Sequence, residues 1–338
     1  MKLFIIPIFI PQSGCPHQCI FCDQSRITGQ KEEPRDTGWI RETIERGLAS
    51  NRIKPGLEVV VAFYGGNFSG LPLGRQEQLL REVQPFRQNG VVDYIRISTR
   101  PDSIDSPRLA FLKERGVKTI ELGVQSLDDK VLGLSGRGHP AATAVEAAKL
   151  IKHFGFNLGI QLMTGLPGQD RDSVRRTMAV VISLGPDLVR IYPTLVIKDT
   201  PLARLYKQGR YQPQSLDEAV DLAAEMVAGF ESAGIAVARV GLMITEDMMS
   251  SGAILAGPWH PAFGDLVKSQ LLTDRIIADA AGRVDRDVEV SVMAHPRDLS
   301  LLTGHQRRGL GRVQLALNAG KVTLKPTEEV PVGYPHVI

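Results

Sequence analysis

A chain of 338 residues is long enough for two domains, or for one large α/β barrel with a smaller appendix. Hydrophobic residues make up 43% and charged residues 23%, which excludes a disordered, a collagen-like and a disulfide-dense secreted chain. The 40 Lys and Arg residues against 37 Asp and Glu residues leave a net charge of +3, too small for the strongly basic character of many nucleic-acid-binding proteins.

The first predicted element is a short apolar stretch at residues 3–10, which Pro7 interrupts and Pro11 follows. A membrane-spanning helix needs about 20 apolar residues. A signal peptide needs a longer apolar region and a small-residue cleavage site. We therefore expect a cytoplasmic protein without a membrane anchor.

Apolar runs rich in branched residues alternate with amphipathic stretches as far as residue 240. The predicted strands are 3–10, 57–64, 93–98, 119–124, 157–163, 187–192 and 235–240. The predicted helices are 37–49, 75–86, 107–115, 141–154, 171–184 and 216–233, the last opened by Ser215 and Glu218 in capping-box spacing. This alternation predicts a parallel α/β sheet in a partial or complete TIM-type (β/α) barrel, with a doubly wound sheet as the competing arrangement.

The alternation of predicted strands and helices ends after Val240. Residues 241–338 contain a Met-rich stretch, one predicted helix near 265–281 and short strand-like segments, so we expect a small α+β appendix after a core at 1–240. A local basic cluster here is most simply a solvated face, and phosphate contact is the alternative. It consists of His305, Arg307, Arg308 and Arg312.

Cys15, Cys19 and Cys22 are the three cysteines of the chain, and they lie within eight residues. An odd, tightly clustered set is a poor disulfide framework. The spacing Cys-x3-Cys-x2-Cys suits an iron–sulfur cube held by three thiolates, which leaves one iron open for a reactive cofactor. The alternatives are free thiols and a zinc site with His17 as fourth ligand. Structural zinc usually takes two separated ligand pairs, and the sequence has no second pair.

The cysteine motif, with Phe21 before its last cysteine and a strand before its first, resembles the radical S-adenosylmethionine (SAM) superfamily. Segments 7–11, 14–16, 21–24 and 27–29 resemble a narrower branch. That branch contains the catalytic subunit of elongator, which modifies tRNA wobble uridines, and its shorter bacterial relatives. Oxygen-independent coproporphyrinogen oxidases are more distant. The resemblance runs from residue 3 to 212, more loosely to 270, and implies a [4Fe-4S] cluster on the three cysteines with SAM beside it.

Further motifs stand at the ends of the predicted strands, where βα barrels carry their active sites. Gly65 and Gly66 end the second strand and let a ligand approach the backbone closely, although a tight βα turn explains them equally well. In the resembled family this segment binds the methionyl amino group of SAM. Many members carry Glu where this chain has Asn67, so we expect mainly backbone contact there.

Ser98 and Arg100 end the third strand, in a segment that resembles the Thr-Arg-Pro-Asp motif of the elongator branch. We expect contact with ribose or carboxylate groups of SAM; the alternative is a plain loop in which Asp102 caps the next helix. Glu121 lies in an otherwise apolar fourth strand, where an unpaired carboxylate costs several kcal/mol, so it requires a ligand or an internal salt bridge. Gln125 leaves the same strand and is a further candidate.

Arg137 stands between two glycines, and we expect an exposed, flexible side chain that can clamp a carboxylate. The resemblance implies that this carboxylate belongs to SAM. The same resemblance implies that Gly165 and Tyr192 line the adenine pocket. Gly165 lies in the Gly-Leu-Pro-Gly turn after the fifth strand, and Tyr192 lies at the end of the sixth. Core packing is the alternative for Tyr192.

Together these features predict an enzyme that reductively cleaves SAM at a [4Fe-4S] cluster and uses the 5′-deoxyadenosyl radical to abstract hydrogen from its substrate. By the same resemblance we expect RNA or a small molecule as the substrate, and a protein such as flavodoxin or ferredoxin as the electron donor. No individual catalytic residue is assigned. The competing functions are a non-enzymatic RNA-binding module that carries zinc or a cluster, and a haem- or porphyrin-related protein.

Overall fold

The computed structural model describes residues 3–10, 13–24, 26, 36–242, 248, 252–281, 289–304 and 308–338. Its contacts divide the chain into two compact units, Met1–Gln214 with Phe230–Pro258, and Ser215–Gly229 with Trp259–Ile338. The domain boundary expected at residue 240 stays a prediction. Over the described ranges, no helix has both the length and the apolar character needed to cross a membrane.

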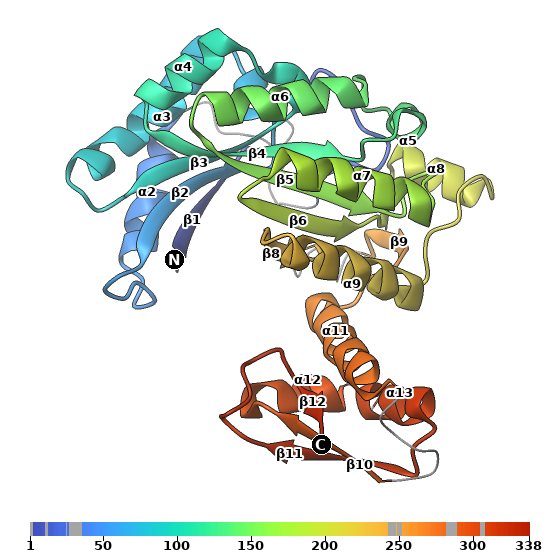
Figure 1. Cartoon of the computed structure of the whole chain (residues 1–338). Helices are drawn as coiled ribbons and strands as arrows, with labels where there is room; N and C mark the ends of the chain where they lie inside the picture. Colours follow the sequence, from blue (N-terminus) through green and yellow to red (C-terminus); the bar gives the residue numbers. More distant parts are fainter. Residues whose placement is uncertain are drawn as a thin grey trace. The chain divides into compact units, whose positions relative to one another are not determined.

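The first unit is built on a seven-stranded parallel sheet in the order β1-β2-β3-β4-β5-β6-β8 (Figure 1). Its strands are β1 Leu3–Phe9, β2 Glu58–Tyr64, β3 Tyr94–Thr99, β4 Val117–Gln125, β5 Asn157–Thr164, β6 Leu188–Pro193 and β8 Ala236–Val240. The spatial order follows the chain order, so the doubly wound alternative, whose order reverses midway, is wrong. The sheet runs from β1 at one edge to β8 at the other, which makes it a partial barrel.

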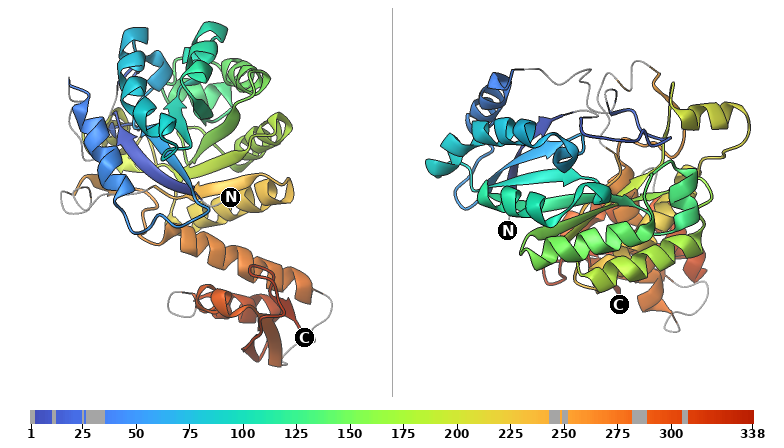
Figure 2. Two further views of the ribbon diagram at one scale, coloured as in Figure 1. Left: turned by 90° about the vertical axis from the view of Figure 1, so that its left-hand side faces the viewer. Right: turned by 90° about the horizontal axis from the view of Figure 1, so that it is seen from above.

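Helices cover the convex face of this curved sheet (Figures 1 and 2). They include α3 Leu73–Gln88, α4 Ser106–Glu114, α6 Ala141–His153 and α7 Arg171–Leu184, and α2 Gly38–Leu48 precedes them. Alternate strand residues form a buried apolar layer, among them Val61, Ile97, Leu122, Ile160 and Ile191. Because side chains alternate across a strand, the residues between them face the concave side, and several of those are polar.

The seven predicted strands are confirmed, and their ends agree to within two residues; β4, for example, begins at 117 where the prediction begins at 119. Short elements escaped prediction because they are too brief to show a period. These are α5 Asp129–Leu134, α8 Pro201–Lys207, the paired strands β7 Val196–Ile197 and β9 Ile254–Ala256, and the 3-10 turns η1 Phe68–Gly70 and η2 Pro101–Ser103. The capping box of α9 (Leu216–Ser232) is confirmed, since the Glu218 backbone N–H donates to Ser215 Oγ at 3.2 Å.

The second unit has the α+β character predicted for the C-terminal region. Its sheet has the order β11-β10-β12, and its helices enclose a core with Leu272, Ile276, Val292 and Leu302. The elements are α11 Phe263–Ala280, β10 Glu289–Ala294, η3 Pro296–Asp298, α12 Leu299–Thr303, α13 Arg308–Leu317, β11 Lys321–Pro326 and β12 His336–Val337. Of the basic cluster, His305 and Arg307 lie outside the described residues, and Arg312 is ion-paired with Asp274 at 2.5 Å.

Candidate functional site

The cysteine loop follows β1 and lies at the carboxyl edge of the sheet. Cys15 is exposed, Cys22 is partly buried and Cys19 is buried. The Cys22 backbone N–H donates to the Cys19 carbonyl at 3.0 Å, a turn that brings the last two cysteines close together. Burial raises the pKa of the Cys22 thiol to about 12, and the neighbouring Cys19 and Cys15 add to the increase. Metal binding to these groups therefore releases protons.

Contacts from distant parts of the chain hold this loop in place. The Ile20 backbone N–H donates to the Ser135 carbonyl at 3.1 Å, and the Ile20 carbonyl accepts from the Leu202 backbone N–H at 2.9 Å. Phe21 packs against an apolar cluster of Val196, Leu202, Ala203 and Tyr211. The aromatic residue of the motif thus serves as an apolar anchor for the loop.

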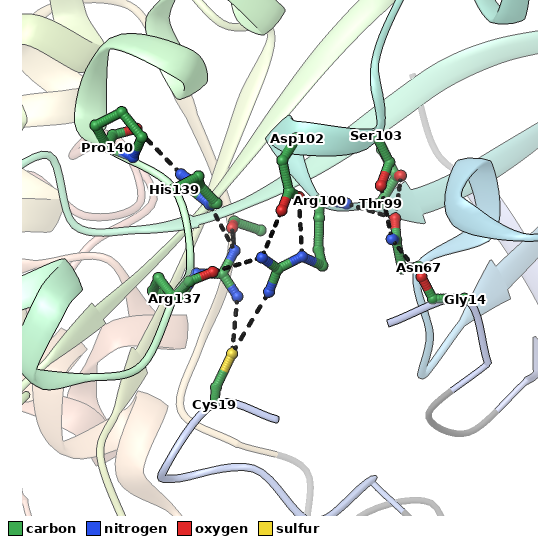
Figure 3. Close-up of polar contacts among 11 residues, drawn as sticks. Gly14, Cys19, Asn67, Thr99, Arg100, Asp102, Ser103, Arg137, His139 and Pro140 are labelled. Carbon is green, nitrogen blue, oxygen red and sulfur yellow. Dashed lines mark hydrogen bonds and ion pairs between the residues drawn. The ribbon is translucent and has the colours of Figure 1, made fainter. Parts of the chain in front are cut away.

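Asn67, just after β2, ties the start of the cysteine loop to the end of β3 (Figure 3). Its Nδ2 donates to the Gly14 carbonyl at 2.7 Å and to Ser103 Oγ at 2.8 Å. Its Oδ1 accepts from Thr99 Oγ1 at 2.7 Å and from the Arg100 backbone N–H at 3.0 Å. Both donors and both lone pairs of the amide are used. The Asn67 side chain is therefore fully engaged within the protein, and the expected backbone contact of this segment with SAM stays a prediction.

Gly65 and Gly66 have structural reasons to be glycine. Gly65 has φ of 82°, in the left-handed region that favours glycine. A Cβ on Gly66 would lie 2.9 Å from the Ser13 carbonyl oxygen and closer still to that of Ile10. Close packing of β2 against the chain entering the cysteine loop therefore requires a glycine at 66, independently of any ligand.

Two buried guanidinium groups are directed at Cys19 (Figure 3). Arg137 Nη1 lies 3.2 Å and Arg100 Nη1 lies 3.7 Å from Cys19 Sγ. Asp102 holds the Arg100 guanidinium through two hydrogen bonds of 2.9 and 2.7 Å. Burial opposes ionisation of Asp102, but its hydrogen bonds and ion pair with Arg100 hold the pKa of this carboxyl below its ordinary value. The charged pair thus presents a fixed cation to the cysteine loop.

The expectation that Arg137 is exposed and flexible is wrong, since the residue is only 4% exposed. Its Nη2 donates to the Gly123 carbonyl and lies 3.4 Å from His139 Nε2. Burial lowers the pKa of His139, and its Nδ1 lies 3.1 Å from the Pro140 carbonyl oxygen. A neutral imidazole that donates from Nδ1 leaves Nε2 as an acceptor, so these contacts hold Arg137 rigidly.

Asp102 does not cap the helix after it, which was the alternative considered for this residue. Asp105 performs that function, because its Oδ1 accepts from the Arg108 backbone N–H at 2.8 Å at the start of α4. Asp102 is thereby left to orient Arg100.

A second polar group lies on the concave face of the sheet and is here called the inner-face cluster: Tyr64, Arg96, Glu121, Arg190 and Tyr192. Glu121 is flanked by both cations, with Arg96 Nη1 2.9 Å from Oε1 and Arg190 Nε 2.7 Å from Oε2. Arg190 Nη2 donates to the Tyr64 hydroxyl at 3.1 Å, and Nη1 lies 3.5 Å from the Tyr192 hydroxyl. The internal ion pair considered for Glu121 is therefore present; its role toward SAM stays a prediction.

Three further predicted residues lie along the same edge of the sheet. Ser98 is on β3, next to the Thr99 that bonds Asn67. Gln125 has φ of 69°, rare for a residue with a side chain, at an irregularity in β4, and its Oε1 accepts from Gln161 Nε2 at 3.2 Å. Gly165 has φ of 74° and follows β5. A positive φ is ordinary for Gly165, but the conformation of Gln125 is unfavourable for a residue with a side chain, and such conformations cluster at functional sites.

Sequence reasoning missed the partners that complete both polar groups. They are Tyr64, Arg96, Thr99, Ser103, His139 and Arg190. A signal was available for two of them, because Arg96 and Arg190 each interrupt an apolar strand at an alternate position. Polar residues on one face of buried strands indicate a polar barrel interior.

The charge around the cysteine loop fits an iron–sulfur cluster. Within the described ranges, no three or more His, Cys, Asp or Glu side chains, the three cysteines included, are arranged around one metal position, so the positions of the ligands alone favour neither zinc nor a cluster. The His17 ring lies against Gly138, where a Cβ would be 2.6 Å from His17 Nε2. Three thiolates on a cluster carry excess negative charge, which the guanidinium groups of Arg100 and Arg137 complement.

Comparisons with known proteins identify the family. Residues 9–181 match the model of the Radical SAM superfamily, and residues 186–273 match the Radical_SAM C-terminal domain. The first match alone covers half of the chain. The protein therefore belongs to the radical SAM superfamily, a class of enzymes.

Among curated proteins, the chain is 25% identical over 255 residues to the tRNA uridine(34) acetyltransferase of Methanocaldococcus infernus, covering 64% of this chain and 48% of that protein. It is 24% identical over 228 residues to the heme chaperone HemW of Bacillus subtilis, covering 65% and 59%. The chain thus spans about half the length of the first of these relatives.

The fold of the archaeal Methanocaldococcus infernus Elp3, in a form lacking residues 1–46, is similar, with a TM-score of 0.64. That comparison covers 81% of this chain and 64% of the other at 20% sequence identity. The likeness supports the partial-barrel fold.

Proposed function

We propose that Cys15, Cys19 and Cys22 hold a [4Fe-4S] cluster at which the protein reductively cleaves SAM. One observation carries the proposal: three thiols share one loop at the carboxyl edge of a partial barrel, and two buried guanidinium groups are directed at the middle thiol. When bound, the cluster and SAM supply a 5′-deoxyadenosyl radical that abstracts hydrogen from the substrate.

The chain's own residues bind and orient the cofactors. Asn67 and the contacts of Ile20 fix the loop, while Arg100 and Arg137 provide positive charge beside it. The proposed SAM contacts are Gly65, Gly66, the Asn67 backbone, Ser98, Arg100, Glu121, Gln125, Arg137, Gly165 and Tyr192. Of these, Arg137 is the proposed partner of the SAM carboxylate, because its guanidinium stands next to a cluster ligand.

RNA is the proposed substrate, and a small molecule is the alternative. Similarity to proteins that are named tRNA uridine(34) acetyltransferases supports RNA, although the chain matches only about half their length. A cytoplasmic flavodoxin or ferredoxin is the proposed electron donor. Similarity to HemW favours a haem-related function as the second candidate, which predicts that haem or porphyrin copurifies with the protein.

Anaerobic reconstitution with iron and sulfide tests the proposed function. We expect about four irons and four sulfides per chain, as a [4Fe-4S] cluster requires. After chemical reduction in the presence of SAM, we expect equal amounts of methionine and 5′-deoxyadenosine. An RNA-binding module that holds zinc would instead yield colourless protein with tightly bound zinc, and an oxygen-protected sample without inorganic sulfide would contradict the proposal.

Arg137→Gln is expected to make the cluster harder to reduce, because reduction adds negative charge and the variant removes a cation 3.2 Å from Cys19 Sγ. A hydrogen bond with a charged partner is worth about 1.5–3 kcal/mol, which for a one-electron couple corresponds to a fall in the midpoint potential of roughly 65–130 mV. Potentiometric EPR measures this shift. Arg137→Lys keeps the charge and should shift the potential less, whereas equal shifts in both variants would show that charge is not the cause.

A further inference from the structure

The inner-face cluster is assembled from strands that are distant in sequence. Its members come from β2, β3, β4 and β6, and Glu121 on β4 reaches Arg190 on β6 across the intervening β5. Gly159 makes this possible, because a Cβ there would lie 2.8 Å from Glu121 Cγ. The concave face thus contains an ion-pair group that requires a glycine in the intervening strand β5.

The charges in this cluster do not balance. Among the residues that the structure describes, Arg96 and Arg190 face one carboxylate, that of Glu121. The exposed fraction of the side chain is 3% for Arg96, 13% for Arg190 and 5% for Glu121. Tyr64 does not supply a second negative charge, because burial and the neighbouring Glu121 raise the pKa of its phenol. The cluster therefore has one positive charge in excess. On the adjacent strand β8, Arg239 is the register partner of Arg190 and brings a further cation to this side.

A purely structural role explains this arrangement poorly. Buried ion pairs seldom stabilise more than apolar packing does, and an excess buried charge is costly. The Arg96 Nε–H is also buried without a hydrogen-bond partner among the described residues. The more exposed of the two cations is Arg190, in the middle of β6, and Tyr192 stands two residues further on, toward the carboxyl edge. Barrel enzymes place their binding groups at this edge.

We propose that the inner-face cluster binds an oxyanion of the substrate, a phosphate or a carboxylate, between Arg96 and Arg190. Glu121 pairs with both guanidinium groups and neutralises one of their two charges, and the Tyr64 and Tyr192 hydroxyls border them. The inference rests on the proposed function in one respect, that the substrate occupies the concave face. The anion-binding group itself follows from the contacts and charges of the strands.

Anion titration of the anaerobically reconstituted full chain tests this proposal. Inorganic phosphate and, separately, acetate are titrated by calorimetry with SAM saturating, so that the SAM carboxylate site is already filled. Arg190→Gln removes the excess cation and is expected to weaken binding about tenfold, a change of about 1.4 kcal/mol. Glu121→Gln removes the competing carboxylate and is expected to tighten binding severalfold. Whichever probe shows this pattern identifies the oxyanion as phosphate or carboxylate.

A binding site predicts opposite changes in anion affinity for Arg190→Gln and Glu121→Gln, whereas a purely structural ion pair does not. Arg176→Gln is the matched control, because that exposed arginine of α7 pairs with Asp128 away from the cluster, and it should leave both titrations unchanged. If Glu121→Gln fails to fold, Arg96→Gln should weaken binding in the same way as Arg190→Gln. Shifts of the same sign in Arg190→Gln and Glu121→Gln, or no binding of either anion with SAM present, would overturn the proposal. If the two variants change anion binding as expected but the protein forms no 5′-deoxyadenosine, the proposed function is rejected and the anion site is retained.

Discussion

Cys19→Ala is expected to abolish iron–sulfur loading and the formation of 5′-deoxyadenosine. Two remaining thiols cannot hold a cube that needs three protein ligands. The variant also removes the sulfur that accepts from Arg100 and Arg137, which leaves two buried guanidinium groups without that partner. Iron and sulfide per chain after anaerobic desalting measure the first effect, and SAM cleavage measures the second. A Cys19→Ala protein that still produced 5′-deoxyadenosine would disprove the ligand assignment.

Cys15→Ala is the matched control for the structural part of this effect. Cys15 is exposed, so its loss should leave the thermal stability of the metal-free protein almost unchanged, within about 0.5 kcal/mol. Its loss should nevertheless remove the cluster as completely as Cys19→Ala does. A full complement of iron in Cys15→Ala would show that the three cysteines do not act as one ligand set.

The strands and the cysteine site could be predicted because each depends on local sequence. Branched apolar runs of six to eight residues predicted β1 to β6 and β8, and the ends of the strands agree closely. The cysteine spacing predicted a cluster loop because three thiols so close in sequence must be close in space. The sequence did not distinguish an open sheet from a closed barrel, because the number of strands fits a partial and a complete barrel equally well.

The side-chain partners could not be predicted because they depend on register and on long-range contacts. Asn67 meets Gly14, which is 53 residues away, and Glu121 meets Arg190 at a separation of 69 residues. The burial of Arg137 also depends on long-range contacts and could not be predicted. Its flanking glycines predict an exposed loop, but contacts with Gly123 and the cysteine loop bury it. Only the folded chain brings these segments together.

The arginines at the cysteine loop and the inner-face cluster have different roles in the proposed site. Arg100 and Arg137 place positive charge beside the cysteine loop, where the iron–sulfur cluster is proposed to bind, at the carboxyl edge of the sheet. The inner-face cluster lies on the concave face of the strands below and supplies a separate positive charge. A substrate anion held there would present its neighbouring carbon atoms to chemistry at the loop. Orientation of the substrate is the main contribution that a protein makes to cofactor-driven radical reactions.

Asn67→Leu is expected to prevent stable cluster binding, although position 67 holds no iron ligand. The variant has a similar volume but leaves the Gly14 carbonyl, Ser103 Oγ and the Arg100 backbone N–H without their amide partner, whereas Thr99 Oγ1 keeps Ser69 Oγ. Each buried group left unpaired costs about 1–3 kcal/mol, so the total should be at least about 3 kcal/mol. Iron retained after anaerobic desalting and thermal unfolding of the reconstituted protein measure the effect.

Asn67→Asp tests the Nδ2 contacts of Asn67 separately from its Oδ1 contacts and shows which of them hold the cysteine loop. Aspartate keeps the acceptors for Thr99 and Arg100 but replaces the Nδ2 donor, so an oxygen faces the Gly14 carbonyl. Ser103→Ala is its control, since it removes only one partner of Nδ2 and should cost less than about 1.5 kcal/mol. If the Gly14 contact positions the cysteines, Asn67→Asp loses iron and Ser103→Ala keeps it. Equal iron in Asn67→Asp and the unaltered protein would mean that the loop is held by Ile20 and Phe21 instead.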